Sequence, residues 1–364
     1  MLRFGARGAA LFLCALIAGC TARGTIQQIV PTASTEVSVV HVVSTRATKA
    51  APPFFTGERA TGRSFARFDI SIPPNRPVGQ IQWRGDGPAD PTQHFLTSAY
   101  APLATKQAFA TSLRRSTSGK PDALVFVHGF NTNFAEALYR LAQLTHDLRT
   151  PGQPVLFSWP SGGDPRGYLY DRDSALLARD ALAQTLTDLD RATGGNVTVV
   201  AFSMGSFLVT ETLRQMANSG GRGTLARLNG VVLVSPDIDV DLFRAQAEAI
   251  KPLPKPFAIM ASEEDSMLSL SALLTGQPDR LGTLSSLDGM EDLGIALIDV
   301  TDFGEDAETS HTTALTSPSL LRILSAARGV DAVVQDELRR ITPNRSRRAG
   351  PSWLRRVMAT EDRN

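Results

Sequence analysis

Strand-like and helix-like patterns alternate along the chain from Leu124 onward. Short runs rich in β-branched and apolar residues are separated by longer segments whose apolar residues recur at helical spacing. This alternation is typical of a parallel sheet covered by helices on both faces. We therefore predict an α/β fold with a mostly parallel sheet. The strand-like runs lie at residues 122–127, 197–202, 231–235, 257–262 and 295–300.

Two predicted helices have clear boundary signals. Asn133 and Glu136 have the spacing of a capping box, which predicts a helix through about Leu148. Leucines recur at helical spacing between residues 173 and 193, and two glycines follow as a stop signal. We assign these leucines to the core, not to a cofactor site. They are Leu182, Leu186 and Leu189.

The remaining segments predict additions to this sheet. Residues 37–83 contain strand-like pieces broken by Pro and Gly, which suggests antiparallel strands at the sheet edge. The interval 234–257 has room for one helix but not for a cap domain. Residues 267–287 are compatible with a mobile lid or with a plain packed helix. No internal repeat is visible.

Ser203 stands at a turn between a strand-like run and a helical segment. Ala201 and Gly205 lie two residues to either side of it, so the motif is a variant of G-x-S-x-G. Small neighbours allow a strained turn that holds a serine hydroxyl above the sheet, at the start of a helix. The amide of Met204 could then stabilise an oxyanion. The alternative is a buried serine in an ordinary turn.

A second turn with a candidate catalytic role follows the strand-like run 122–127. There His128 and Gly129 end the run, at the place where α/β-hydrolases supply a second oxyanion-hole amide. We expect Phe130 to donate it, or Asn131 if the turn is shifted by one residue. His128 is interpreted as a residue that shapes the turn rather than as a base.

The histidine of a triad is limited by chain order. In this fold the nucleophile comes first, then the acid, then the histidine. Of five histidines, only His311 follows Ser203. It lies in a polar loop after the strand-like run 295–300, where a general base is expected. A surface histidine in an acidic loop is the alternative.

The acid is chosen by its position after the strands. Asp265 follows the second strand past the serine, the usual place in this fold, and Asp237 follows the first, the recognised alternative. We expect Asp265 to orient the imidazole and to stabilise its charged form. Asp237 remains the second candidate. Phe130, Asn131, Trp159, Tyr168 and Tyr170 are candidate pocket residues, although Trp159 suits the core equally well.

Several separate motifs together resemble one bacterial family, the α/β-hydrolases of unknown function catalogued as DUF900. The resemblance extends from about Val39 to about Arg328 and implies the α/β-hydrolase fold. It also implies Ser203 as nucleophile, Asp265 as acid and His311 as base. The residue before the serine is commonly histidine in this family but is Phe202 here. The matching segments are 43–46, 71–76, 126–131, 156–161, 167–171, 203–205 and 235–239.

The N-terminus predicts export and lipid attachment. Two arginines precede a short apolar run that ends in Ile17-Ala18-Gly19-Cys20, which resembles the lipobox of bacterial lipoproteins. We expect acylation of Cys20 and anchoring in the outer membrane, facing the periplasm; an ordinary signal cut near Ala22 is the alternative. After acylation no thiol remains for disulfides, metals or catalysis.

Composition and spacing complete the predicted organisation. The 364 residues carry a net charge of +1, which gives no support to nucleic-acid binding, and 42% are hydrophobic, enough for one large core. Arginines dominate residues 339–356, a tail that could touch anionic lipids or peptidoglycan, or be solvated. The predicted parts are a signal peptide (1–19), a polar tether (20–36), a hydrolase domain (37–328, divided at 120/121) and a C-terminal helix with a basic tail (329–364).

These observations favour a membrane-anchored serine hydrolase that cleaves an ester, thioester or amide. The expected substrate is a small-molecule or lipid-like acyl compound. A non-catalytic envelope lipoprotein with a binding or scaffold role is the alternative. A metalloenzyme is weakly supported, because the histidines are scattered without ligand spacing, and neither metal nor cofactor is predicted.

Overall fold

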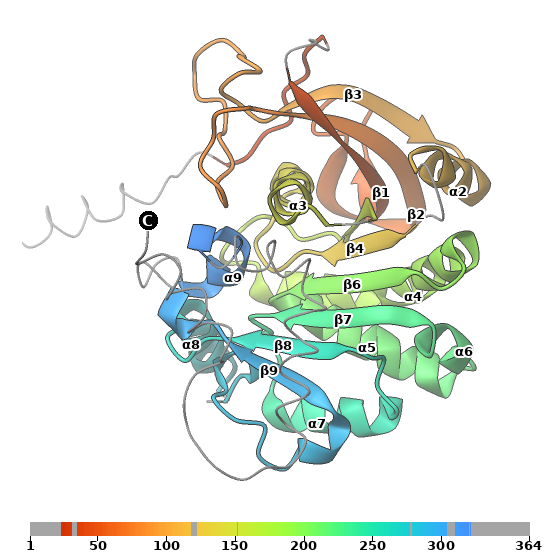
Figure 1. The fold of residues 1–364 in the computed structure, drawn as a ribbon, viewed down its shortest axis with the longest axis vertical. Coiled ribbons are helices and arrows are strands. Elements are labelled where there is room, and N and C mark those ends of the chain that lie inside the picture. Colours follow the sequence, from red (N-terminus) through yellow and green to blue (C-terminus); the bar gives the residue numbers. More distant parts are fainter. Residues whose placement is uncertain are drawn as a thin grey trace, which may run out of the picture.

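The described residues form one sheet flanked by helices (Figure 1). The structure is a computed structural model that describes residues 23–30, 35–117, 122–150, 152–276, 279–303, 310–319 and 321. Within these residues, nine strands pair in the order β3-β2-β1-β5-β4-β6-β7-β8-β9. The β1–β2 and β2–β3 pairs are antiparallel and the remaining pairs are parallel. The strands are β1 (Glu36–Thr48), β2 (Phe55–Ile72), β3 (Leu96–Leu103), β4 (Ala123–Val127), β5 (Gln153–Ser158), β6 (Val197–Phe202), β7 (Leu228–Val234), β8 (Phe257–Ala261) and β9 (Ile295–Asp299).

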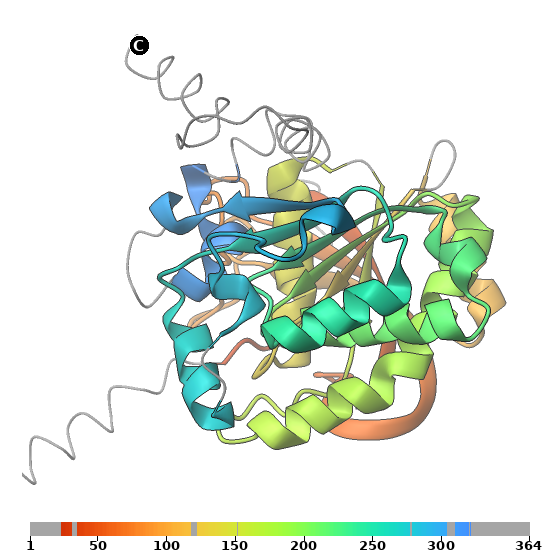
Figure 2. The same ribbon diagram turned by 90° about the horizontal axis from the view of Figure 1, so that it is seen from below.

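Helices cover both faces of this sheet (Figure 2). Helices α2, α4, α5 and α7 bury their apolar residues in one core cluster, and α3 and α9 bury theirs in the cluster on the opposite face. The predicted α/β fold with antiparallel N-terminal strands is therefore confirmed. The helices are α2 (Lys106–Arg115), α3 (Phe134–Leu148), α4 (Tyr168–Thr193), α5 (Met204–Asn218), α6 (Arg222–Leu225), α7 (Val240–Ile250), α8 (Ser266–Thr275) and α9 (Thr313–Thr316). Short 3₁₀ turns are η1 (Leu281–Thr283), η2 (Glu291–Leu293), η3 (Thr301–Phe303) and η4 (Ser310–Thr312).

Strand β6 shows why the strands are apolar on both sides. Val197, Val199 and Ala201 are buried in the cluster beneath α4 and α5. The alternate residues Val200 and Phe202 pack against the cluster on the α3 face. Because side chains alternate along a strand, a sheet covered on both faces requires such continuous apolar runs.

The helix ends follow local sequence signals where these are strong. The capping box of α3 is present, with Asn133 and Glu136 each bonding the other's backbone amide. Helix α4 ends at Gly194, whose φ of 70° suits glycine. The leucine pattern indicated this helix from about residue 173, but it begins at Tyr168. Its N-cap residue is Gly167, which makes no side-chain capping bond, so no sequence signal marks this start.

The segments that could carry a cap are occupied by packed helices. Helix α7 fills the short interval between β7 and β8, as predicted. Helix α8 buries Leu268 and Ser271, which agrees with the packed-helix alternative for this segment.

Residues 23–30, here called the N-terminal arm, lie inside the predicted polar tether but are packed on the body. Ile26 is buried among the core residues on the α3 face. The carbonyl of Gln27 accepts from the amide of Thr97 (2.8 Å), and the amide of Ile29 donates to the carbonyl of Thr97 (3.0 Å). The arm therefore behaves as part of the fold, because it satisfies backbone groups of β3.

Several predicted features lie outside the described residues. These are the signal peptide, Cys20 and the arginine-rich tail. In the described part of the chain, no helix has both the length and the apolar character needed to cross a membrane.

Candidate active site

Ser203 lies in a strained turn between β6 and α5. Its φ of 52° and ψ of −122° fall outside the usual regions for a residue with a side chain. Gly205 makes the turn possible, because a Cβ at this position would overlap the backbone carbonyls of Val127 and His128. The turn thus presses the start of α5 against the end of β4.

The His-Gly turn after β4 lies directly against this serine. A Cβ on Gly129 would come within 2.9 Å of Ser203 Cβ, so glycine is required for the approach. The amide of Asn131 donates to Asp171 Oδ2 (3.0 Å). Among the hydrogen bonds of the described residues, none uses the amide of Phe130 or of Met204 as donor. Met204 directly follows Ser203, and Phe130 follows the glycine that approaches Ser203 Cβ.

His311 and Asp265 form a pair at the same edge of the sheet. The imidazole Nδ1 lies 2.7 Å from Asp265 Oδ2, and this carboxylate is fully buried. Its other oxygen accepts the amide of Leu268 (3.0 Å), which fixes the carboxylate at the start of α8. A carboxylate that accepts from Nδ1 leaves Nε2 as the nitrogen able to take a proton.

The imidazole of His311 packs beside the turn that carries the serine. Its ring centroid lies 4.8 Å from that of Phe202, the residue before Ser203. The family departure at this position therefore places an apolar ring against the imidazole. Within the described residues, no hydrogen bond joins Ser203 and His311.

Asp237 is engaged by other partners. Its two oxygens accept from Ser271 Oγ (2.7 Å) and from the hydroxyl of Tyr168 (2.9 Å). Arg280 lies 3.6 Å away and compensates the charge. Burial, with the nearby carboxylate, raises the pKa of Tyr168 to about 12, so its hydroxyl stays a donor. The described partners of Asp237 are therefore Tyr168, Ser271 and Arg280, and no histidine is among them.

His128 is buried beneath the turn and is held by its neighbours. Its Nδ1 lies 3.0 Å from the carbonyl of Gly129, and its Nε2 lies 3.3 Å from Arg46 Nη2. A proton on Nδ1 satisfies these two contacts, since Nε2 then accepts from the guanidinium, whereas a proton on Nε2 would suit the carbonyl of Trp159, 3.1 Å away. Burial and the Arg46 charge lower the pKa of His128 to about 3. This agrees with the turn-shaping interpretation.

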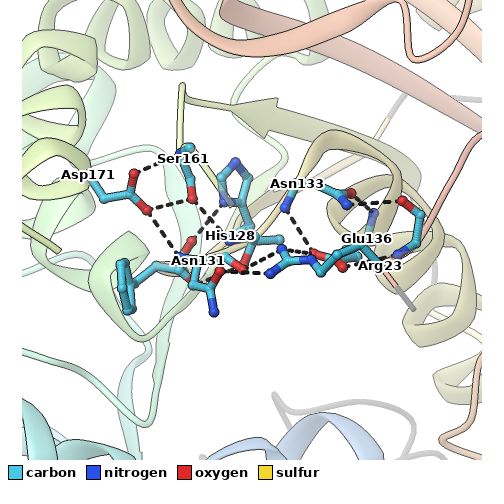
Figure 3. Close-up of polar contacts among 12 residues, drawn as sticks. Arg23, His128, Asn131, Asn133, Glu136, Ser161 and Asp171 are labelled. Atoms are coloured by element: carbon cyan, nitrogen blue, oxygen red, sulfur yellow. Dashed lines mark hydrogen bonds and ion pairs between the residues drawn. The ribbon is translucent and has the colours of Figure 1, made fainter. Parts of the chain in front are cut away.

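Arg46 and Asp171 support the loops around the site, and sequence reasoning assigned them no role. The Arg46 guanidinium is buried and donates to Ser158 Oγ and to the carbonyls of Thr56, Thr132 and Ser161. Asp171 accepts from Ser161 Oγ as well as from Asn131 (Figure 3). Both residues stand in segments that resemble the family, which was the available signal.

The predicted pocket residues fall in different places. Trp159 is fully buried, stacks on His128 and donates to its carbonyl, so it belongs to the core. Tyr170 is 40% exposed, lies under Arg59 and bonds the carbonyl of Gly57. Tyr168 packs edge-on against Phe130 and lines a cavity of about 130 Å³ next to Met204. The other cavity residues include Arg172, Phe207, Asp237 and Leu242.

The described residues contain no group of three or more His, Cys, Asp or Glu side chains placed to hold a metal ion. The side chains that the structure brings to this edge of the sheet include a serine in a strained turn and an imidazole–carboxylate pair.

Residues 102–328 match the family described as alpha/beta hydrolase of unknown function (DUF900). The match covers more than half of the chain, and the chain belongs to this family. The match begins within β3, so β1 and β2 lie outside it, although the resemblance in sequence was expected to start near Val39.

Solved structures with some similarity include lipase B of Aspergillus fumigatus, with 13% identity, coverage of 74% of this chain and 67% of that chain, and a TM-score of 0.41. An esterase of Pseudomonas putida has 13% identity, coverage of 91% and 90%, and a TM-score of 0.39. An esterase of Pyrobaculum calidifontis has 14% identity, coverage of 90% of both chains, and a TM-score of 0.36. The search of curated proteins found no match.

Proposed function

We propose that this α/β-hydrolase is a serine hydrolase that cleaves carboxylic esters through an acyl-enzyme. The observation that carries the proposal is the His311–Asp265 hydrogen bond beside the strained turn of Ser203. A strained serine, a buried carboxylate and an imidazole have no structural need to meet at one edge. Together they form the parts of a nucleophile, a base and an orienting acid.

The proposed reaction begins with attack of Ser203 Oγ on the ester carbonyl carbon. His311 Nε2 takes the hydroxyl proton, and the amides of Phe130 and Met204 stabilise the oxyanion. Collapse of the tetrahedral species breaks the ester C–O bond, and the leaving alkoxide takes the proton from His311. Water then attacks the acyl-enzyme with His311 again as base, which releases the acid and restores Ser203.

The two sides of Ser203 suit the two parts of an ester. The leaving oxygen must lie within reach of His311, which packs beside Phe202. Besides Met204 and Phe207, the cavity is lined by Arg172, Asp237, Asp239 and Arg280, so it suits a short, polar acyl part. At about 130 Å³ it is smaller than the roughly 300–1,000 Å³ of typical ligand pockets. We therefore expect short acyl groups to be preferred over long ones.

Esters are the favoured class because an alkoxide leaves more readily than an amine. Thioesters and amides remain alternative substrates of the same machinery. No feature of the described residues indicates a peptide-binding groove, so amides rank lowest.

The decisive experiment is labelling with a fluorophosphonate probe. Wild-type protein should label, and Ser203→Ala should not. Ser206→Ala is a matched control. Ser206 is a buried serine in α5, the helix that Ser203 precedes, and its hydroxyl donates to the carbonyl of Ala201. Equal labelling of wild type and Ser203→Ala would refute the hydrolase and favour the non-catalytic binding or scaffold alternative. A screen of aryl esters from acetate to palmitate would then test the acyl-length preference.

We further propose that Cys20 is acylated and anchors the protein in the outer membrane, facing the periplasm. The support is the lipobox-like sequence before it and the absence of an acidic residue after it. Stable anchoring requires more than one acyl chain, which lipoproteins carry. Metabolic labelling with an alkyne fatty acid should mark wild type and not Cys20→Ala, with Cys14→Ala as the control that keeps the label.

A further inference from the structure

The N-terminal arm reaches the turn that holds the proposed oxyanion donor. One end of the arm is fixed to the sheet by Ile26 and by its bonds with Thr97. At the other end, Arg23 lies on the loop between β4 and α3 (Figure 3). A segment that precedes the family match by many residues therefore contacts the catalytic edge.

Arg23 holds Asn131 at two points. Its Nη1 donates to Asn131 Oδ1 (2.7 Å), and its Nη2 donates to the Asn131 carbonyl (2.8 Å). The same guanidinium pairs with Glu136 Oε2 (2.7 Å). Bidentate contacts of this type fix geometry better than a single hydrogen bond does, because two directions are constrained at once.

The backbone of the arm is fitted to the same loop. The amide of Gly24 donates to Glu136 Oε1 (3.2 Å), and Asn133 Nδ2 donates to the carbonyl of Gly24 (3.0 Å). A side chain at Gly24 would overlap Trp83, so the arm passes close to the body here. Arg23 is thus delivered by a defined path and not by a chance surface contact.

Asn131 is the residue where the turn is most constrained. Its φ of 52° is unusual for a residue with a side chain, and its amide is bound by Asp171. Arg23 binds the carbonyl on the other side, so the peptide units before and after Asn131 are both fixed. Phe130, the proposed oxyanion donor, is the residue immediately before it.

We propose that Arg23 is a positioning residue that holds the oxyanion turn in its productive conformation. This inference rests on the proposed function, since it assigns Arg23 a part in stabilising the oxyanion through Phe130. The contact with Glu136 is not required for α3 itself, because Asn133 and Glu136 already cap that helix. Arg23 is also partly exposed, so a surface ion pair of this kind adds little to folding stability.

The test compares Arg23→Ala, Arg23→Lys and the control Gln28→Ala in the full-length protein in detergent. Gln28 lies on the same arm with an exposed side chain. With a short aryl ester that wild type hydrolyses, Arg23→Ala should lower kcat by about tenfold and leave KM within twofold. Gln28→Ala should match wild type in kcat and in Tm.

Two readouts separate positioning from a structural role. Free guanidinium at millimolar concentration should restore part of the kcat of Arg23→Ala and leave wild type unchanged. A boronic acid, whose serine adduct places a negative oxygen at the oxyanion position, should bind Arg23→Ala more weakly by the same factor as kcat falls. Arg23→Lys, which keeps one charge and loses the fork, should lie between wild type and Arg23→Ala.

Each outcome decides the proposal. A kcat of Arg23→Ala within twofold of wild type overturns the positioning role while the hydrolase stands. The positioning role is also overturned if Arg23→Ala and Arg23→Lys both show a large drop in Tm and guanidinium does not restore the lost kcat. If wild type neither labels nor hydrolyses any ester, the proposed function fails first, and that result is seen without any Arg23 variant.

Discussion

Two histidines at the same edge of the sheet have opposite surroundings. His128 is enclosed beneath the oxyanion turn, with an arginine against one nitrogen and a carbonyl against the other. His311 lies on a loop at the rim, with a carboxylate on Nδ1 and an aromatic ring beside it. The enclosed ring is kept neutral by burial and by Arg46, whereas the ring at the rim has a buried carboxylate as its hydrogen-bond partner.

The comparison teaches that the partners of a histidine limit the role that it can take. A ring whose two nitrogens are both engaged can shape a turn but cannot carry a proton back and forth. A ring with a carboxylate on one nitrogen can accept a proton on the other. The following predictions test this contrast, from the largest expected effect to the smallest.

Exchanging each histidine for asparagine should separate their roles most strongly. His311→Asn should lower kcat for a short ester by about 10³-fold or more, because the base is lost, and should leave Tm nearly unchanged. His128→Asn should destabilise the protein by roughly 2–4 kcal/mol, because Arg46 and Gly129 lose buried partners. Steady-state kinetics and urea unfolding measure the two effects. A larger kcat loss for His128→Asn than for His311→Asn would reverse the assignment.

The two buried carboxylates should differ in the same way. Asp265→Asn should lower kcat by about 10²–10⁴-fold, because the imidazole loses the group that orients it and stabilises its charge. Asp237→Asn should change kcat by less than tenfold and lower Tm, since Arg280 loses its compensating charge. Kinetics and thermal unfolding of the two variants side by side provide the check. Equal kcat losses would return Asp237 to the place of the acid.

Folding stability should fall as the pH decreases from 7 to 5. Burial lowers the pKa of His128 to about 3 and that of His41 to about 4, both below the unfolded value of about 6.5. Between these values the unfolded chain binds more protons, so acid favours unfolding; above pH 7 the effect vanishes. Each histidine should contribute about 2 kcal/mol to the loss by pH 5.

The variant His128→Asn isolates one of these contributions. The difference between its free energies of unfolding at pH 7 and pH 5, measured with urea, should be about 2 kcal/mol smaller than that of wild type. This pH range lies above the titration of ordinary carboxylates, so their contribution is small. An unchanged pH difference would mean that His128 is not held neutral.

Removing the hydroxyl of Tyr168 should have the smallest effect. Tyr168→Phe deletes one hydrogen bond to Asp237, while Ser271 and Arg280 remain. We expect a loss of about 1 kcal/mol in the free energy of unfolding and a kcat within threefold of wild type. A loss of activity comparable to that of Asp265→Asn would connect Tyr168 and Asp237 to the chemistry.

The sequence was most informative where a local signal or chain order decides the outcome. The capping box at Asn133 and the glycine stop at Gly194 predicted the helix ends, and the order of triad residues left only His311 as a histidine candidate. The choice between Asp237 and Asp265 could not be made in this way. Both follow consecutive strands, and the side chains that distinguish them are distant in sequence: Tyr168 and Ser271 bond Asp237, whereas His311 bonds Asp265.

Long-range side-chain partners explain what sequence reasoning missed at the site. Nothing in the sequence around Arg46 indicates that its guanidinium is buried and bonds residues of β2, of β5 and of the loops after β4 and β5. Trp159 follows a strand and could face a pocket or the core; its stacking on His128 decides this. Arg23 lies in a segment whose polar composition suggested a tether. Its contacts could not be predicted, because its partners Asn131 and Glu136 lie more than a hundred residues later.

The position of Arg23 limits how the molecule can stand on a membrane. Only two residues, Thr21 and Ala22, lie between Cys20 and Arg23, and the three residue steps from one to the other cover at most about 11 Å. If Cys20 carries the proposed acyl chains, the oxyanion turn, which Arg23 contacts, therefore lies close to the lipid headgroups and is not separated from them by a long flexible tether.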